Sequence, residues 1–240
     1  MNKTKIIATI GPSCSDINIL QEMVNSGVGT FRINMSHGDS ESKKQLFDLV
    51  KSVKHPEGGR PAILADLCGP KIRIINISDK FELQDGDSVV ISNKEGSGDI
   101  FVTSSISLSN VITGSKILIN DGKVQLEVDE VIDDNSLRCK TLIGGEIQKG
   151  KGVNFPGVSL GVPALTDQDK EDLKLALNEE SDWIALSFVR NASDIDGVHE
   201  IMDSFNVRLP VMAKIEKWEA LEDLVNITDA FDGLMVDRGD

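Results

Sequence analysis

Near the end of the chain, charged residues occur in pairs two positions apart. Lys214 precedes Glu216, and Arg238 precedes Asp240. Because side chains two residues apart in a strand project from the same side, each pair brings a cation and a carboxylate together. Two carboxylates from neighbouring strands would suit Mg²⁺, and Lys214 could neutralise charge on a transferring phosphoryl group or an enolate. A structural ion pair is the alternative for each pair.

A second group of polar residues lies nearer the start of the chain. Arg32, Asn34 and Ser36 alternate through an extended segment, and Asp66 ends a later apolar run. In a strand the first three share one face, offering a guanidinium for phosphate and two oxygen ligands, which Asp66 could join. From spacing alone, hydrogen-bonded packing explains these residues equally well.

The elements that must position these residues form a strand–helix repeat. Short apolar runs alternate with amphipathic stretches, and the strand-like runs lie near residues 6–10, 30–35, 62–65, 183–188, 210–215 and 233–236. Such repeats predict a parallel sheet, either open and doubly wound or closed as a (β/α)₈ barrel. No G-x-G-x-x-G follows the first strand, and the polar residues fall at the C-terminal ends of strands, which favours a TIM-type barrel.

This repeat stops at its sixth strand of eight, so two strand–helix units needed for closure are absent from the sequence. We therefore expect the 240-residue chain alone to be weakly active or inactive. Open sheet edges should also make it prone to association.

The stretch from 71 to 157 has a different texture. Its apolar residues alternate with period two, as in residues 123–129, and Asn120-Asp121-Gly122 is a strong turn signal. Residues 145–151 match P-loop spacing, but Gly152 replaces the required Ser or Thr, so we interpret them as a hinge. The stretch predicts a small, mainly antiparallel β domain inserted after the third barrel strand. The predicted domains are residues 1–70 (barrel, first part), 71–157 (inserted β domain) and 158–240 (barrel, second part).

Composition and charge exclude several classes of function. The net charge of −14 argues against a nucleic-acid partner. No apolar run approaches the ~20 residues of a membrane span, and no signal-peptide pattern precedes the first strand, so we expect a cytoplasmic protein without a membrane partner. Three widely spaced cysteines argue against both a disulfide framework and a thiolate metal site.

Six motifs together resemble one family. They are Thr4–Pro12, Arg32–Gly38, Asp66–Pro70, Lys151–Gly157, Lys214–Glu216 and Arg238–Asp240. They resemble the motifs of pyruvate kinase, in that family's order and across the whole chain. The resemblance implies a TIM-type barrel interrupted by a mobile β domain. It also implies phosphoryl transfer from phosphoenolpyruvate to ADP, giving pyruvate and ATP in glycolysis, and a homotetrameric full-length form.

The resemblance also implies roles for individual residues. Lys214 and Arg32 match catalytic residues that bind the substrate, together with Gly239 and Asp240. Glu216 and Asp240 match the ligands of a divalent cation, Mg²⁺ or Mn²⁺. The positions implied to bind the nucleotide are Asn34, His37, Arg73, Asp121 and Lys151.

One motif departs from the commoner family pattern. Asn34, Ser36, Asp66 and the carbonyl of Leu67 match the ligands of a monovalent cation. Where many members have Asp-Thr-Lys-Gly-Pro-Glu, however, this chain ends the motif with Lys71. The lysine resembles the K⁺-independent branch, and its ammonium group could supply the charge of the ion. We therefore predict that K⁺ is not required.

Two alternatives stay open. A different metal-dependent barrel that stabilises pyruvate or phosphoenolpyruvate enolates, such as an aldolase, would use the same metal and lysine. The inserted β domain argues against it. The chain could instead be a non-catalytic or catalytically incomplete relative.

Overall fold

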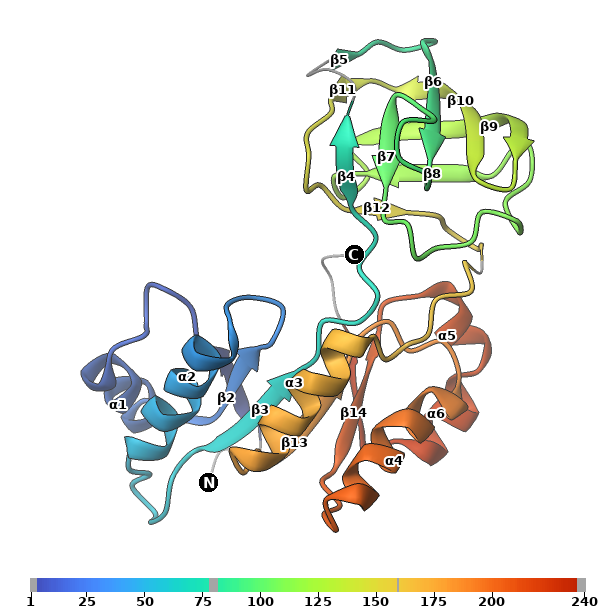
Figure 1. Ribbon diagram of the computed structural model, residues 1–240. Coiled ribbons are helices and arrows are strands. Elements are labelled where there is room, and N and C mark those ends of the chain that lie inside the picture. Colours follow the sequence, from blue (N-terminus) through green and yellow to red (C-terminus); the bar gives the residue numbers. More distant parts are fainter. Residues whose placement is uncertain (1–3, 78–81, 159, 237–240) are drawn as a thin grey trace. The chain divides into compact units, whose positions relative to one another are not determined.

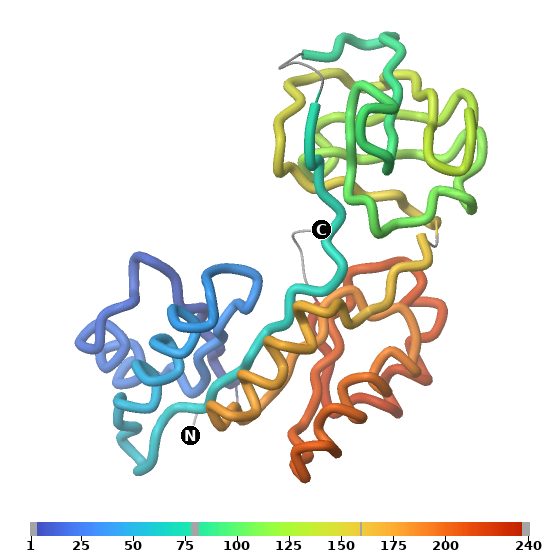
Figure 2. Tube along the Cα trace, viewed as in Figure 1, coloured from blue at the N-terminus to red at the C-terminus, as the bar shows by residue number. Residues whose placement is uncertain are grey.

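The computed structural model describes residues 4–77, 82–158 and 160–236 and divides them into two compact units. The first contains residues up to Gly69 and from Ala164 onward, and the second contains residues Pro70–Pro163 (Figure 1). The tube in Figure 2 can be followed from the blue segment of the first unit through the second and back to the red segment. The chain rejoins the first unit after Pro163, whereas the sequence pattern placed this boundary at residue 157.

The first unit alternates strands and helices. Its elements before the second unit are β1 (Ile6–Thr9), α1 (Ile17–Asn25), β2 (Val28–Asn34), α2 (Ser40–Ser52) and β3 (Ala62–Asp66). Those after it are α3 (Asp167–Asn178), β13 (Trp183–Leu186), η1 (Ala192–Ile195), α4 (Asp196–Ser204), β14 (Val211–Ile215), α5 (Trp218–Glu222), α6 (Leu224–Ala230) and β15 (Gly233–Val236).

The strands of the first unit form one parallel sheet. Their order is β1-β2-β3-β13-β14-β15, and every neighbouring pair is parallel. β3 pairs directly with β13, so the strands on either side of the second unit are neighbours, with Asp66 opposite Ala185. The predicted fold class, six strands of a TIM-type barrel interrupted after the third, is confirmed.

Apolar faces of the helices and the sheet build the core of this unit. On β2, Phe31 and Ile33 alternate with more exposed residues and are completely buried. The helices contribute residues at helical spacing, such as Leu20 and Val24 of α1 and Leu173 of α3. Aliphatic side chains therefore hold the sheet under its helices, as the low aromatic content of 4% requires.

Helix boundaries in the first unit follow local hydrogen bonding. α3 begins with a capping box, in which Thr166 and Asp169 each accept from the other's backbone N–H. The apolar residues Leu221 and Leu224 lie on two helices instead of one, because Asp223 ends α5 and precedes α6. Asp223 has φ −105° and ψ 16°, and its side chain accepts a hydrogen bond from the N–H of Ala192 at 2.8 Å. This distant contact stabilises the break.

The second unit consists of strands and turns. Its strands are β4 (Ile74–Ile77), β5 (Glu82–Leu83), β6 (Ser88–Ser92), β7 (Ile100–Val102), β8 (Lys116–Ile119), β9 (Val124–Asp133), β10 (Ser136–Ile143), β11 (Gly145–Glu146) and β12 (Val153–Asn154). Seven of them form a sheet in the order β12-β8-β9-β10-β6-β7-β4, and β11 pairs with β5. All pairs are antiparallel except β6–β7, which is parallel. The described part of this unit has no helix, so residues 145–151 do not lead into one.

A tight turn joins β8 to β9 in the second unit. Asn120 and Asp121 have φ values of 53° and 58°, and Gly122 has 79°. These left-handed residues join β8 to β9, as the sequence predicts. Cys14, Cys68 and Cys139 form no disulfide bond with one another. Among the described residues, none of the helices has both the length and the apolar character needed to span a membrane.

Candidate active site

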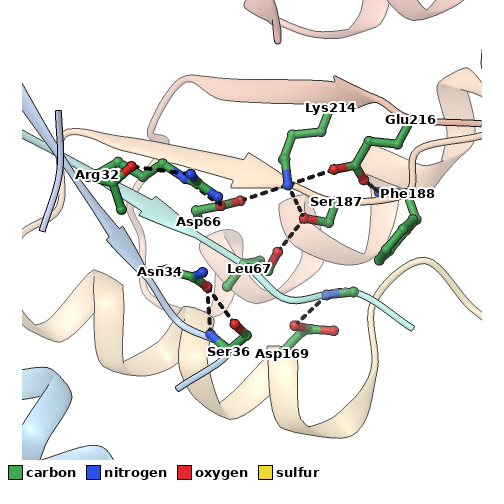
Figure 3. Close-up of polar contacts among 12 residues, drawn as sticks. Arg32, Asn34, Ser36, Asp66, Leu67, Asp169, Ser187, Phe188, Lys214 and Glu216 are labelled. Carbon is green, nitrogen blue, oxygen red and sulfur yellow. Dashed lines mark hydrogen bonds and ion pairs between the residues drawn. The ribbon is translucent and has the colours of Figure 1, made fainter. Parts of the chain in front are cut away.

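The C-terminal ends of the parallel strands bring together polar residues that lie far apart in the sequence. Arg32 and Asn34 come from β2, Asp66 from β3 and Lys214 from β14. Parallel strands present these ends at the same edge of the sheet, and Asn34 is the register partner of Asp66. Figure 3 shows these side chains converging with residues that follow β13.

A chain of alternating charge joins four side chains, those of Arg32, Asp66, Lys214 and Glu216 (Figure 3). Arg32 donates from Nε to Oδ2 of Asp66 at 2.6 Å, and its Nη2 also contacts Oδ2. Lys214 Nζ lies 3.7 Å from Oδ1 of Asp66 and 2.7 Å from Oε1 of Glu216. The Asp66, Lys214 and Glu216 side chains are 2%, 7% and 1% exposed. Burial strengthens their mutual attraction, and each charge has an opposite neighbour to offset its desolvation.

The two residues that follow β13 complete the contacts to Lys214 and Glu216. They are Ser187 and Phe188. The Ser187 hydroxyl donates to the Leu67 carbonyl at 2.6 Å and accepts from Lys214 Nζ at 3.0 Å. The N–H of Phe188 donates to Oε2 of Glu216 at 2.8 Å. Phe188 has φ +56°, a left-handed conformation that is uncommon for a bulky residue. This backbone conformation accompanies an N–H directed at the carboxylate.

Sequence reasoning missed both residues. Ser187 had a usable signal, since it is a polar residue directly after an apolar strand, as Asn34 and Asp66 are near the ends of theirs. Phe188 contributes a backbone N–H, which no side-chain pattern reveals.

The residues that match a monovalent-cation site are hydrogen-bonded within the first unit. Oδ1 of Asn34 accepts from the N–H of Ser36 at 3.0 Å and from its hydroxyl at 2.7 Å. The carbonyl of Leu67 accepts from Ser187, and its N–H donates to the carbonyl of Ala185 at 2.9 Å. The carboxylate of Asp66 is held by Arg32 and Lys214. Amide, hydroxyl and carbonyl oxygens suit a hard cation in their chemistry.

The first unit is tied together where the chain leaves it and returns. Asp169, which is completely buried, accepts at Oδ1 from the N–H of Gly69 at 3.1 Å and at Oδ2 from the N–H of Thr166 at 2.9 Å. Gly69 has φ +69°, and a Cβ there would lie 2.7 Å from Cδ2 of Phe188. Position 69 therefore requires glycine, and one carboxylate holds both connecting segments. Sequence reasoning missed the hydrogen bond from Gly69 to Asp169.

The second unit gathers three predicted nucleotide-binding residues around Gly152. Arg73 forms a β-bridge with Gly152 and donates from Nη1 to the carbonyl of Gly150 at 2.8 Å. Lys151 directly precedes Gly152, whose carbonyl accepts from the N–H of Asn120, next to Asp121 in the turn. Lys71, predicted to replace K⁺, is also in this unit and is exposed.

Some predicted site residues remain apart from these clusters. His37, expected at the nucleotide, is exposed just after β2. Gly239 and Asp240 lie outside the described residues. Within the described residues, no group of three or more His, Cys, Asp or Glu side chains is arranged to hold a metal ion. The buried carboxylate of Glu216 offers the oxygen ligands that Mg²⁺ prefers, so the described half of the predicted divalent site fits such an ion in its chemistry.

Comparison with known proteins identifies the family. Residues 1–240 match the family described as pyruvate kinase, barrel domain. The chain is 41% identical to pyruvate kinase 2 of Synechocystis sp. (strain PCC 6803), covering 99% of this chain and 42% of that protein. It is 39% identical to pyruvate kinase of Mycobacterium tuberculosis, covering 98% of this chain and 51% of that protein. For pyruvate kinase of Staphylococcus aureus the identity is 37%, covering 100% of this chain and 42% of that protein.

The chain thus spans about half the length of the curated relatives that it matches. The match extends over both units, including the strand ends that carry Arg32, Asp66 and Lys214 and the inserted unit that carries Arg73 and Asp121. The chain belongs to the pyruvate kinase family.

Proposed function

We propose that the protein transfers a phosphoryl group from phosphoenolpyruvate to ADP, giving pyruvate and ATP. The observation that carries this proposal is the chain of contacts Arg32–Asp66–Lys214–Glu216, its last three side chains buried, at the strand ends of a pyruvate kinase family member. It offers two cations for an anionic substrate and a carboxylate for a divalent ion. A cytoplasmic location and a homotetrameric assembly of the full-length form belong to the same proposal and rest on the family alone.

The proposed roles at the first unit follow charge and burial. Lys214 would neutralise charge that develops on the transferring phosphoryl group and the enolate, and Arg32 would bind the phosphate. Gly239 and Asp240 would complete the substrate site. Glu216 and Asp240 would hold Mg²⁺ or Mn²⁺, which supplies Lewis-acid stabilisation of phosphoryl oxygens when bound.

We propose nucleotide-binding residues in each unit separately. Asn34 and His37 belong to the first unit, and Arg73, Asp121 and Lys151 to the second. The backbone contacts around Gly152 support the second group, because they bring together the segments that carry Arg73, Lys151 and Asp121. Cations of this kind suit the phosphates of ADP or ATP.

The reaction can be tested on the product of the complete gene that encodes residues 1–240. Pyruvate formation from phosphoenolpyruvate and ADP is measured with Mg²⁺ present. We expect turnover that Lys214→Ala reduces by about 10²- to 10³-fold, the range of a lost transition-state contact. The matched control is Lys170→Ala, which removes an exposed lysine that pairs with Asp167. Absence of turnover in the unaltered protein, or equal turnover in Lys214→Ala, would contradict the proposal.

We also propose that Lys71 supplies the positive charge that K⁺ gives in other members. Activity should then be nearly equal in K⁺ and in a bulky organic cation, because a fixed ammonium group replaces the ion. Lys71→Glu should make activity depend on K⁺, whereas Lys140→Glu, at an exposed position of β10, should not. Strong K⁺ stimulation of the unaltered protein would refute this part of the proposal and leave the reaction itself standing.

A further inference from the structure

The hydroxyl of Ser187 lies between two groups of the proposed site and has no role in it so far. It contacts the carbonyl of Leu67 at 2.6 Å and Nζ of Lys214 at 3.0 Å, and the residue is 2% exposed. Buried polar groups in proteins are almost always hydrogen-bonded, because a buried donor or acceptor without a partner lowers the stability of the fold. The position of this hydroxyl therefore bears directly on Lys214.

The direction of both hydrogen bonds follows from the chemistry of the three groups. A carbonyl oxygen can only accept, so the single hydroxyl proton of Ser187 points at Leu67. Its lone pairs remain for Lys214, whose ammonium group can only donate. Ser187 thus presents a fixed acceptor to Lys214.

The acceptor is held on a rigid frame. The N–H of Leu67 is bonded to the carbonyl of Ala185 at 2.9 Å, where β3 and β13 pair, and the Leu67 side chain is completely buried. On the other side, a Cβ at Gly69 would lie 3.1 Å from Cβ of Ser187, so little space separates the two segments. Ser187 therefore cannot easily turn away from Lys214.

A flexible lysine between two carboxylates needs such an acceptor. Nζ lies 2.7 Å from Oε1 of Glu216 and 3.7 Å from Oδ1 of Asp66, and both carboxylates attract it. The lysine stem has four rotatable carbons and no preferred direction of its own. The neutral oxygen of Ser187 adds a third point that holds the ammonium group without neutralising its charge.

We propose that Ser187 is a positioning residue for Lys214, which keeps the ammonium group directed at the reacting phosphoryl group. This inference rests on the proposed function, since Lys214 is the group through which Ser187 acts. The same hydroxyl also connects Lys214 with Leu67, whose carbonyl matches a monovalent-cation ligand. The Ser187 hydroxyl contacts both groups.

The test compares Ser187→Ala and Ser187→Cys with the unaltered protein, using the product of the complete gene. Alanine removes the hydroxyl, and cysteine keeps the approximate size with a much weaker hydrogen bond. We expect kcat to fall about 10- to 100-fold in both variants, the range of a hydrogen bond to a charged group. The KM for phosphoenolpyruvate should change less than about threefold, because the lost contact orients a group that acts mainly in the transition state.

The matched control is Ser181→Ala. Ser181 precedes the same strand, β13, and its buried Oγ accepts or donates no hydrogen bond among the described residues. It should therefore retain kcat. Thermal unfolding of all variants reports whether the fold is kept. If Ser187→Ala does not fold, the kcat and KM of Ser187→Cys alone test the positioning role.

The outcomes separate the two proposals. If Lys214→Ala loses activity but Ser187→Ala and Ser187→Cys keep the kcat of the unaltered protein, the positioning role is wrong and the proposed function stands. If cysteine restores kcat while alanine does not, Ser187 only fills space and the inference is overturned. If the unaltered protein forms no pyruvate, the proposed function itself has failed. Reduced kcat in both variants, with KM and Ser181→Ala unchanged, supports the inference.

Discussion

At the scale of single residues, the site is a row of four charges that offset one another, three of them buried. Arg32 and Lys214 carry two positive charges, and Asp66 and Glu216 carry two negative ones. Removing one member leaves a buried charge without its partner, which is more costly than the pair is stabilising. The arrangement therefore favours keeping the complete set, whatever ligand later binds beside it.

The buried Cys139 thiol gives a test of the interior at this scale. Burial, followed by repulsion from Asp129, raises its pKa from 9.0 to about 12. The thiol therefore stays protonated and unreactive at pH 8, whereas Cys14 and Cys68 are only half-buried. Iodoacetamide followed by mass spectrometry should label Cys14 and Cys68 well before Cys139 in the folded protein, and all three in urea.

The sign of the related pH effect can also be stated. The pKa of Cys139 is higher in the folded protein than in the unfolded chain. Its contribution to the free energy of unfolding is therefore fully present below pH 9, where the thiol is neutral in both states. This contribution is lost as the pH rises from about 9 toward 12. Equal labelling of Cys139 and Cys68 in the native protein at pH 8 would show that the region around β10 opens readily.

Residue types and spacing anticipated part of this site. Lys214 and Glu216 were found because strand geometry places alternate residues on one side, which local sequence reveals. The pairing of Arg32 with Asp66 depends on the register between β2 and β3, which sequence alone leaves open. Asp169 accepts a hydrogen bond from Gly69 across 100 residues, a nonlocal contact that no local sequence pattern reveals.

At the scale of elements, helices α2 and α3 are joined by a buried ion pair away from the proposed site. Nζ of Lys43 lies 2.5 Å from Oδ1 of Asp172, and their side chains are 5% and 2% exposed. The two residues are 129 positions apart, so the pair connects helices on either side of the second unit. It specifies how α3 docks after the chain returns.

This pair predicts a large coupling between two substitutions. Lys43→Met should lower the free energy of unfolding of the first unit by about 3–5 kcal/mol, because it leaves the Asp172 carboxylate buried without its cation. The double variant Lys43→Met/Asp172→Leu should recover most of that loss, since two apolar side chains need no partner. Urea unfolding measures both.

An exposed pair on α3 supplies the control. Lys174 and Glu171 lie 2.7 Å apart, but their side chains are 43% and 68% exposed. Lys174→Met should change the free energy of unfolding by less than about 1 kcal/mol, as for surface ion pairs in general. If the double variant at positions 43 and 172 is as unstable as Lys43→Met, the pair is not the origin of the loss.

The break between α5 and α6 shows where element boundaries escape sequence reasoning. Residues 218–230 have no glycine or proline to mark a stop, and their apolar spacing is typical of one helix. The break follows from Asp223, whose carboxylate binds the N–H of Ala192, 31 residues earlier. A tertiary hydrogen bond has overridden the local pattern.

At the scale of the whole molecule, the chain has two hydrophobic cores. One is built from the strands and helices of the first unit, and the other from the second unit, with Ile91, Ile117 and Leu126 completely buried in it. The change from helical to period-two spacing predicted the second unit, because periodicity is a local property. Its strand order, including the parallel β6–β7 pair, is set by nonlocal pairing and was not predicted.

Separate cores predict separate unfolding transitions. Both tryptophans, Trp183 and Trp218, lie in the first unit, so tryptophan fluorescence reports that unit alone. Circular dichroism in the far ultraviolet reports strands and helices of both. We expect the two signals to give different urea midpoints, because domains with their own cores open as separate cooperative units. Coincident midpoints, together with a single calorimetric transition, would mean that the chain unfolds as one unit.

The direct pairing of β3 with β13 has a consequence for how the protein is made. Leu67 and its partner Ser187 are separated by 120 residues. At roughly 5–20 residues per second, a ribosome needs about 6–24 s to synthesise the intervening segment. The second unit is synthesised before β13 and can fold in that interval. During this time, the edge of β3 that pairs with β13 has no partner strand. The nascent chain thus has an exposed edge on the β1–β2–β3 sheet for several seconds. A chaperone that binds during synthesis would act on this edge.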